Sequence, residues 1–238
     1  MSSVDSVAAP AHRPGVHLEV PGSRPLTPEL VAAVQEVCDR AEELGDEPVV
    51  VHLGGGPDDG TPPATDGVAV HLVNKWERAL RRLERLETAT VAVVSGDCSG
   101  PAVEVLLSCD YRIAGPDLRL TLPFSAGEPW PGMLVYRLAN QLGVARARSL
   151  VLFGTALSAE RAAEVGLVDE VTETVAAVTA ERLARARDFA GTELAIRRRL
   201  LLDAAATSFE DALGTHLAAC DRALRRSDRT AVREAPAG

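Results

Sequence analysis

Hydrophobic residues in the first quarter of the chain recur with two different periods. Over 16–20 they alternate with polar or small residues, which predicts a half-buried strand. Thr27, followed by a proline, marks the start of a helix that we expect to run to about Leu44, where Gly45 ends it. The apolar, β-branched run 48–53 then predicts a buried parallel strand. This order of strand, helix and strand is typical of a βαβ fold.

A longer helix is predicted over 68–87, because apolar residues recur there every three or four positions. These positions are Leu72, Trp76, Leu80, Leu83 and Leu86. Arginines occupy the other face, which we interpret as a solvated surface. The apolar face around Trp76 has two interpretations, a helix packed into its own core or an interface with a partner protein.

A second buried strand is predicted over 91–95, and it is followed by a glycine-containing turn and a short apolar helix over 102–109. Two more short strands are expected at 111–114 and 118–122. After a loop rich in proline and glycine, most of the remaining chain is predicted to be helical. We expect the chemistry of the protein to lie at the turn between the second buried strand and its helix.

The two ends of the chain differ in composition from the rest. Residues 1–14 and 227–238 are small, polar and contain proline, so we expect disordered tails there. Between them we expect an α/β core over 15–172 and a helical C-terminal oligomerisation region over 173–226. The Gly-, Pro- and Asp-rich stretch 54–67 predicts a long loop, of a kind that is often functional and sometimes only mobile.

Composition narrows the classes of function. The 238 residues carry a net charge of −9, which opposes binding to a phosphate backbone, so we do not expect nucleic acid as a partner. Aromatic residues make up only 3%, which leaves few platforms for stacking bases or sugars. No apolar run is long enough to cross a bilayer, and the N-terminus lacks the pattern of a signal peptide. We therefore expect a cytoplasmic protein without a membrane partner.

Residues that often bind metals do not form a recognisable site in this sequence. The four cysteines lie far apart, without the C-x-x-C spacing of zinc or redox sites, and we expect them to be free, mostly buried thiols. The histidines and aspartates nearest one another, His52, His71, Asp58 and Asp59, match no metal-ligand spacing. No metal is predicted.

Two other motifs are weak when their spacing is checked. The glycines of Gly54–Gly60 are spaced wrongly for a dinucleotide fingerprint, and Pro57 prevents the helix that such a site needs. A nicotinamide cofactor is therefore not expected. The run GDCSG at 96–100 is similar to a nucleophile elbow, but Ser99 stands one place late and has no identifiable histidine partner.

The segment SGDCSGPAVEVLLSCDYRIA, at 95–114, carries a more specific pattern. Its glycine turn lets the backbone approach a ligand, and the following helix points its first N–H groups to the same place. Glu104 lies on the first turn of that helix, so the segment suits an anion with an adjacent base. The alternative interpretation of Glu104 is a solvated or salt-bridged helix residue.

This segment resembles the signature NG-x-A-x-GGG-x-E-L-x-x-x-CD of the enoyl-CoA hydratase (crotonase) superfamily. Other segments similar to that superfamily follow in the same order: LPFSAGEPWPG at 122–132, RLANQLG at 137–143 and GTALSAERAAEVGLVDEV at 154–171. The resemblance covers about 16–226. It implies an α/β fold with a crotonase-like spiral core of ββα repeats, an acyl-CoA substrate, and no cofactor besides the coenzyme A of that substrate. It also implies a trimer-based homo- or hetero-oligomer in which C-terminal helices pack against neighbours.

Within the superfamily the chain is most similar to the DpgB-type hydratase-like proteins of 3,5-dihydroxyphenylglycine biosynthesis. The similarity lies in 74–84, 96–100, 104–112, 130–133 and 195–226. It implies a protein that assists a type III polyketide synthase, together with a companion hydratase, in forming 3,5-dihydroxyphenylacetyl-CoA. That product leads to dihydroxyphenylglycine and glycopeptide antibiotics.

The resemblance also implies a set of site residues. Members of the superfamily polarise a thioester carbonyl with two backbone N–H groups and move protons beside it with one or two carboxylates. Glu104 matches the first carboxylate, whereas Phe124 replaces the second, and Glu128 on the same loop is the nearest substitute. The positions expected to bind the thioester are Gly54, Gly55, Gly100, Pro101 and Ala102.

Pro101 changes the reaction that we expect. It stands where the superfamily has a glycine whose N–H stabilises the oxyanion, and proline has no N–H to donate. Loss of one such donor costs about a hundredfold to a thousandfold in rate. We therefore expect dehydration and aromatisation of a cyclised polyketide thioester instead of hydration of a simple enoyl-CoA. The alternative is a non-catalytic partner that binds and enhances the synthase or a companion hydratase.

Overall fold

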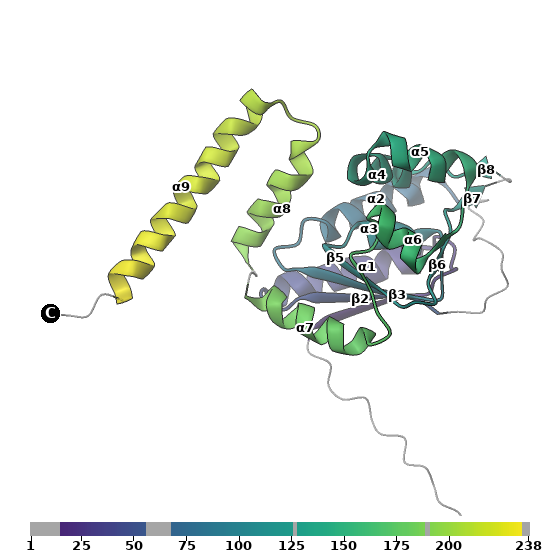
Figure 1. The fold of residues 1–238 in the computed structure, drawn as a ribbon, viewed down its shortest axis with the longest axis horizontal. Helices are drawn as coiled ribbons and strands as arrows, with labels where there is room; N and C mark the ends of the chain where they lie inside the picture. The colour runs from purple at the N-terminus through teal and green to yellow at the C-terminus, as the bar shows by residue number, and fades with distance from the viewer. Residues whose placement is uncertain (1–14, 56–67, 126–127, 189–190, 235–238) are drawn as a thin grey trace, which may run out of the picture.

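The computed structural model describes residues 15–55, 68–125, 128–188 and 191–234, and a parallel sheet forms its centre (Figure 1). The strands of this sheet lie in the order β1-β2-β3-β5-β10, and each neighbouring pair is parallel. They are β1 (Val16–Val20), β2 (Val49–Gly54), β3 (Thr90–Ser95), β5 (Tyr111–Ala114) and β10 (Glu170–Val171). Parallel neighbours need crossover connections, so helices must cover the faces of the sheet.

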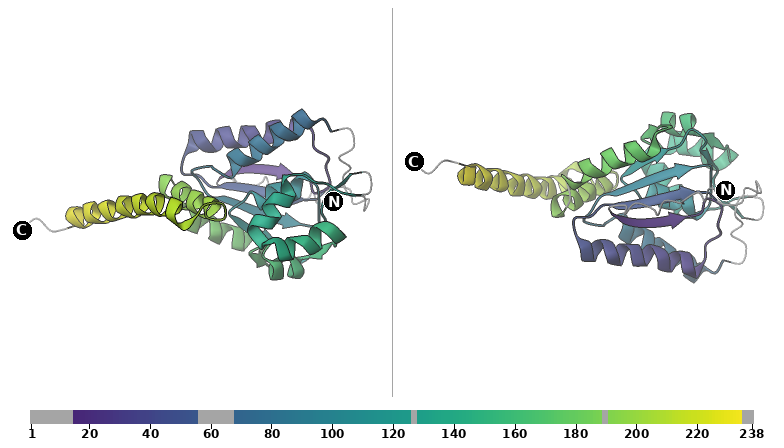
Figure 2. Two further views of the ribbon diagram at one scale, coloured as in Figure 1. Left: turned by 90° about the horizontal axis from the view of Figure 1, so that it is seen from above. Right: turned by 90° about the horizontal axis from the view of Figure 1, so that it is seen from below.

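Helices α1 (Pro28–Leu44) and α2 (Val70–Leu83) cover one face of the sheet, and α7 (Val175–Arg187) packs on the other (Figure 2). The ends of α1 confirm the sequence prediction. Thr27 Oγ1 accepts a hydrogen bond from Leu30 N at 3.2 Å, and Gly45 N donates to Ala41 O at 3.0 Å. Each bond satisfies a backbone group that a helix end otherwise leaves without a partner, the N–H of Leu30 and the C=O of Ala41.

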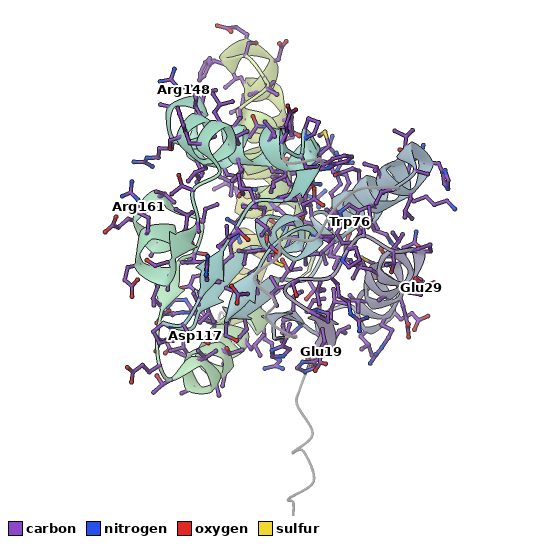
Figure 3. All side chains as sticks on the ribbon, turned by 90° about the vertical axis from the view of Figure 1, so that its right-hand side faces the viewer. Glu19, Glu29, Trp76, Asp117, Arg148 and Arg161 are labelled. Carbon is purple, nitrogen blue, oxygen red and sulfur yellow. The ribbon has the colours of Figure 1, made fainter. Side chains whose placement is uncertain are left out.

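The main hydrophobic core joins the sheet to α1 and α2 and extends into residues 98–168. Trp76, Leu80 and Leu83 of α2 are all buried in it, and Trp76 is only 1% exposed. Figure 3 shows Trp76 inside the body, whereas Arg148 and Arg161 lie at its edge. Of the two interpretations of this helix face, packing into the core is therefore right, and a partner interface at Trp76 is wrong.

Short elements complete the body around the sheet. A small second sheet contains β4 (Asp97–Cys98), β6 (Arg119–Leu120) and β9 (Leu157–Ser158), and β7 (Phe124–Ser125) pairs with β8 (Glu128–Pro129) as a hairpin. The helices here are α3 (Pro101–Leu107), α4 (Met133–Leu142), α5 (Val144–Phe153) and α6 (Ala159–Val165). The small sheet lies directly after the carboxyl ends of the main strands, because β4 begins two residues after β3 ends.

The boundary between the core and the C-terminal helices lies later than the predicted one at residue 173. Leu183 of α7 is buried against Val50, Val91 and Ile113 of the sheet, so α7 belongs to the core body and not to a separate helical region. Helices α8 (Thr192–Ala204) and α9 (Phe209–Glu234) follow, and α9 projects away from the body (Figures 1 and 2).

The predicted C-terminal tail also starts too early. Helix α9 continues to Glu234, into the range 227–238 that we expected to be disordered. The polar segment SDRTAVRE contains neither Gly nor Pro, so it can extend a solvated helix. The expected tail 1–14 and most of the expected loop 54–67 lie outside the described residues. Among the helices that the structure describes, none combines the length and the apolar character needed to span a membrane.

Candidate active site at the start of helix α3

Three chain segments converge at the carboxyl ends of β1, β2 and β3. Gly54 ends β2 with φ +105°, and a Cβ there would lie 1.8 Å from the carbonyl oxygen of Ser95. Gly22 follows β1, and a Cβ there would lie 1.7 Å from the carbonyl oxygen of Asp97. Only glycine fits such close backbone approaches. The carboxyl ends of parallel strands are also where α/β sheets commonly bind ligands.

Hydrogen bonds hold these segments together. Gly22 N donates to Gly55 O at 3.1 Å, and Ser99 N donates to Gly22 O at 2.6 Å. Ser99 Oγ donates to the same carbonyl at 3.2 Å and is buried. Ser99 therefore holds the turn before α3 against the segment that follows β1.

Helix α3 begins directly at this turn. Gly100 precedes it with φ +57°, and Pro101 occupies its first position, where the fixed φ of proline suits a helix start. Pro101 has no N–H, and Ala102 N donates to Ser99 O at 3.3 Å. Gly54 and Gly55, at the end of β2, are linked through Gly22 to the turn that carries Gly100, Pro101 and Ala102. On the helix side of this turn, Pro101 has no N–H and the N–H of Ala102 is already bonded, so the role of these five residues in binding a thioester stays a prediction.

Glu104 lies on the first turn of α3 with only 5% of the residue exposed. Its Oε2 accepts a hydrogen bond from Trp76 Nε1 at 2.5 Å. Burial raises the pKa of Glu104 to about 7, and the hydrogen bond from Trp76 opposes this shift. The negative charge of Glu77 raises the pKa further, whereas the positive charge of Arg137 lowers it. Such a carboxyl group can take up and release a proton near neutral pH.

The other carboxylate oxygen of Glu104 faces the loop before α4. A Cβ at Gly132 would lie 3.5 Å from Glu104 Oε1 and 2.4 Å from Trp130 Nε1. The space that a side chain at Gly132 would need is therefore shared by Trp130 and the carboxylate. The two tryptophans of the chain, Trp76 and Trp130, thus both lie near Glu104.

A buried ion-pair cluster supports the site from α2 and α4. Arg137 on α4 is 7% exposed and donates to Glu77 and Glu84, each at 2.8 Å. Burial raises the pKa of Glu77, and Arg137 opposes that shift. Because a buried charge is costly without a partner, the cluster fixes α4 against α2 beside Glu104.

The end of α3 is tied to the sheet and to α8. Asp110 Oδ2 accepts from Thr90 N at 2.8 Å and from Thr90 Oγ1 at 2.9 Å. Arg198 of α8 donates to both oxygens of Asp110, at 2.6 and 2.5 Å, and to the backbone carbonyls of Leu86 and Thr88. This network fixes where α3 ends and therefore helps to orient Glu104.

Other predicted residues lie elsewhere. Glu128 lies in β8 with an exposed side chain, whereas Glu104 is buried, and its role as second acid stays a prediction. His52 stacks on His17, and the nearest ring nitrogens of the two are 3.4 Å apart. His71 is exposed on α2, and Asp58 and Asp59 lie outside the described residues. The residues that the structure describes include no cluster of three or more potential metal ligands.

Several site residues could not be recognised from the sequence alone. Trp76 and Leu80 share one apolar helix face, so nothing distinguished the residue that bonds to Glu104 from its neighbours. Gly22 could have been noticed as a glycine directly after a strand, at the edge where ligands bind. Arg137 and Trp130 lie in segments whose meeting with α2 depends on the tertiary fold.

The comparisons with known sequences agree on one family. The sequence profile of the enoyl-CoA hydratase/isomerase family matches residues 69–234. A protein of Amycolatopsis orientalis described as an enoyl-CoA-hydratase is 48% identical over 210 residues, which cover 88% of this chain and 95% of that protein.

Solved structures show the same fold. An enoyl-CoA hydratase/isomerase from Marinobacter aquaeolei superposes with a TM-score of 0.72 at 18% identity, covering 90% of this chain and 89% of the other. An enoyl-CoA hydratase from Bacillus anthracis gives 0.72 at 20% identity, with coverage of 92% and 91%. These identities are low, so the structural likeness establishes the fold alone, and it confirms the α/β crotonase-like architecture that we predicted.

Proposed function

Because the chain belongs to the enoyl-CoA hydratase/isomerase family, we propose that it acts on an acyl-CoA thioester with Glu104 as the general base. The observation that carries this proposal is the buried carboxyl group of Glu104, whose pKa is raised to about 7 directly after the glycine turn. A general base works best when its pKa lies near the operating pH. Coenzyme A enters only as part of the substrate, without a separate cofactor.

The chemistry starts with a proton beside the thioester carbonyl. Glu104 takes the α-proton, and negative charge develops on the carbonyl oxygen. Pro101 cannot donate a hydrogen bond to that oxygen, and the N–H of Ala102 is already bonded to Ser99. A reaction with a low demand for oxyanion stabilisation therefore suits the site better than hydration of a simple enoyl-CoA.

Loss of water from a cyclised polyketide thioester meets this requirement. Glu104 takes the α-proton, the C–O bond to the β-hydroxyl breaks, and the protonated Glu104 returns the proton to the departing hydroxide, so that water leaves as the ring moves towards aromaticity. The stability of the aromatic product lowers the barrier that the oxyanion site must overcome. We propose this dehydration and aromatisation as the role of a DpgB-type protein, which works with a type III polyketide synthase and a companion hydratase to form 3,5-dihydroxyphenylacetyl-CoA.

A second candidate function is that of a non-catalytic partner that binds and enhances the synthase or the companion hydratase. Two observations favour it. Pro101 and Phe124 replace groups that the family uses in catalysis. In addition, α9 exposes apolar side chains on one face, with Leu217 58% and Leu224 66% exposed. Such a face suits a neighbour in a homo- or hetero-oligomer.

The two functions are separated by mass spectrometry of the products that a type III synthase releases from malonyl-CoA. The reaction is run without this protein, with wild type, with Glu104→Gln and with Pro101→Gly. Wild type should increase 3,5-dihydroxyphenylacetyl-CoA or its free acid, and Glu104→Gln should lower that gain by about a hundredfold, as loss of a general base does. Pro101→Gly should retain or raise it.

The result for Glu104→Gln decides between the catalytic function and the partner function. A Glu104→Gln protein that matches wild type would contradict the catalytic proposal and favour the partner role. If wild-type protein leaves the products of the synthase unchanged, it does not assist the synthase, and both candidate functions are contradicted.

A further inference from the structure

We propose that Trp76 is a positioning residue for Glu104: its indole N–H holds Oε2, so that Oε1 is the oxygen that exchanges a proton with the substrate. The inference rests on the proposed function for the identity of the reaction. The contact between the two side chains stands on the geometry alone.

The contact joins two helices far apart in sequence. Trp76 lies on α2 and Glu104 on α3, and Nε1 donates to Oε2 at 2.5 Å. Both residues are buried, Trp76 at 1% and Glu104 at 5% exposed. A buried indole N–H needs an acceptor, and here that acceptor is the carboxylate of the candidate base. The bond restricts rotation of the carboxylate about its last side-chain torsion.

Because Oε2 of Glu104 accepts the hydrogen bond from Trp76, Oε1 is the oxygen that lies towards the loop before α4. Gly132 lies there, and a Cβ on it would come within 3.5 Å of Oε1. Trp130 borders the same space, because its Nε1 would lie 2.4 Å from that Cβ. Oε1 therefore lies towards this loop, whereas Trp76 holds Oε2 from the α2 side, so we assign the proton exchange to Oε1.

The charged groups around Glu104 are engaged with one another. From α2, Glu77 faces it, and from α4, Arg137 does. Arg137 is bonded to Glu77 and to Glu84, each at 2.8 Å. Among the influences that lower the pKa of Glu104, the hydrogen bond from Trp76 is larger than the charge of Arg137. Trp76 is thus well placed to set the ionisation of Glu104 as well as its orientation.

A tryptophan that merely fills the core behaves differently when it is replaced. Trp76→Phe removes the N–H and keeps an aromatic ring in the core. If the ring only fills space, the variant loses stability but leaves the ionisation of Glu104 unchanged. If the N–H positions the carboxylate, the variant raises the pKa of Glu104, because a donor stabilises the charged form.

The first measurement needs no substrate. The chain has two tryptophans, so a Trp130→Phe protein reports the fluorescence of Trp76 alone. We expect its emission to change with pH around a midpoint of about 7, as the carboxyl group that accepts its N–H titrates. The same titration in a protein that also carries Glu104→Gln should disappear.

The second measurement follows the pH dependence of α-proton exchange in phenylacetyl-CoA dissolved in D₂O. Trp76→Phe should move the midpoint upwards by about one to two pH units, the size that a hydrogen bond to a charged group gives. The rate at neutral pH should fall about tenfold or more and recover in alkaline solution. Tyr136→Phe is the matched control, an exposed aromatic residue of α4, and its midpoint should equal that of wild type.

Two results would overturn the inference: an emission titration that persists after Glu104→Gln, or equal exchange midpoints for Trp76→Phe and wild type. If Trp76→Phe does not fold, the emission titration of Trp130→Phe decides alone. A titration in Trp130→Phe together with no exchange by wild type would contradict the proposed function while supporting the coupling of Trp76 to Glu104.

Discussion

At the scale of single residues, the buried carboxyl group of Glu104 makes stability depend on pH. Its pKa of about 7 in the folded protein exceeds the ordinary value of 4.5, so the folded state binds this proton more tightly than the unfolded state. The folded protein therefore loses stability as pH rises through this range. Glu104→Gln keeps an acceptor for Trp76 and removes the charge, so it should raise the free energy of unfolding by up to about 3 kcal/mol in alkaline solution.

Urea unfolding at acid and alkaline pH measures this effect. In acid, Glu104→Gln should raise the free energy of unfolding only slightly, because the carboxyl group of Glu104 is already protonated in the folded wild type. Glu29→Gln is the control, because Glu29 is exposed on the first turn of α1 and its pKa is lowered by hydrogen bonds from the backbone and Thr27. Glu29→Gln should not raise the free energy of unfolding in alkaline solution. An equal gain from Glu104→Gln at both pH values would show that burial of the charge is not the cause.

Gly22 is a second residue whose role follows from close packing. A Cβ there would lie 1.7 Å from the carbonyl oxygen of Asp97, and backbone cannot move aside cheaply. Gly22→Ala should therefore destabilise the protein by about 2 kcal/mol or more and loosen the turn before α3. Gly214→Ala meets nothing within 4 Å on α9 and should be neutral or stabilising by up to about 1 kcal/mol. Thermal unfolding compares the two, and equal effects would contradict this account of Gly22.

Some residue-level predictions depend on local chemistry alone. Proline has no N–H in any structure, so the missing donor at Pro101 needed no tertiary information, and the prediction that Ser99 is not a nucleophile rests on the sequence in the same way. The partner of Glu104 is different, because Trp76 meets it only after α2 has packed beside α3. The raised pKa of Glu104 follows from that packing and could not be anticipated.

At the scale of elements, the clearest test concerns how α8 is fastened to the body. Arg198 is 8% exposed and bonds to both carboxylate oxygens of Asp110. Arg198→Ala leaves Asp110 without its cation and should destabilise by about 3 kcal/mol, as loss of one partner from a buried ion pair does. Arg199→Ala, at the next position, breaks only an exposed pair with Asp203 and should cost less than about 0.5 kcal/mol.

Urea unfolding gives the two free energies, and hydrogen exchange of the α8 amides reports whether the helix itself is released. Protection of α8 should fall in Arg198→Ala and persist in Arg199→Ala. If both variants lose the same free energy of unfolding, the bonds of Arg198 to Asp110 do not hold α8 on the body.

Helices and long strands were predictable because their period extends over many residues. The bounds of β1, α1 and β3 agree with the sequence prediction within a residue or two. The strands β4, β7, β8, β9 and β10 escaped prediction, since each is two residues long and shows no period. The end of α9 was missed for another reason, because a polar composition without Gly or Pro fits both a tail and a solvated helix.

At the scale of the whole molecule, the crossover connections of one parallel sheet bring the site together. Segments after β1, β2 and β3 meet at one edge of the sheet, and α2 and α4 then enclose Glu104. The sequence predicted the α/β core and its family resemblance from ordered motifs. It could not predict that α7 completes the core or that α9 leaves the body, because two charged helices with some apolar positions look alike until their neighbours are known.

The most direct test of the account is whether Glu104 exchanges protons with a thioester. Phenylacetyl-CoA is incubated in D₂O with wild type or Glu104→Gln, and NMR follows the loss of its α-protons. We predict exchange by wild type with a midpoint of about pH 7 and a rate about a hundredfold lower for Glu104→Gln. Exchange by Glu104→Gln at the wild-type rate would contradict the central claim.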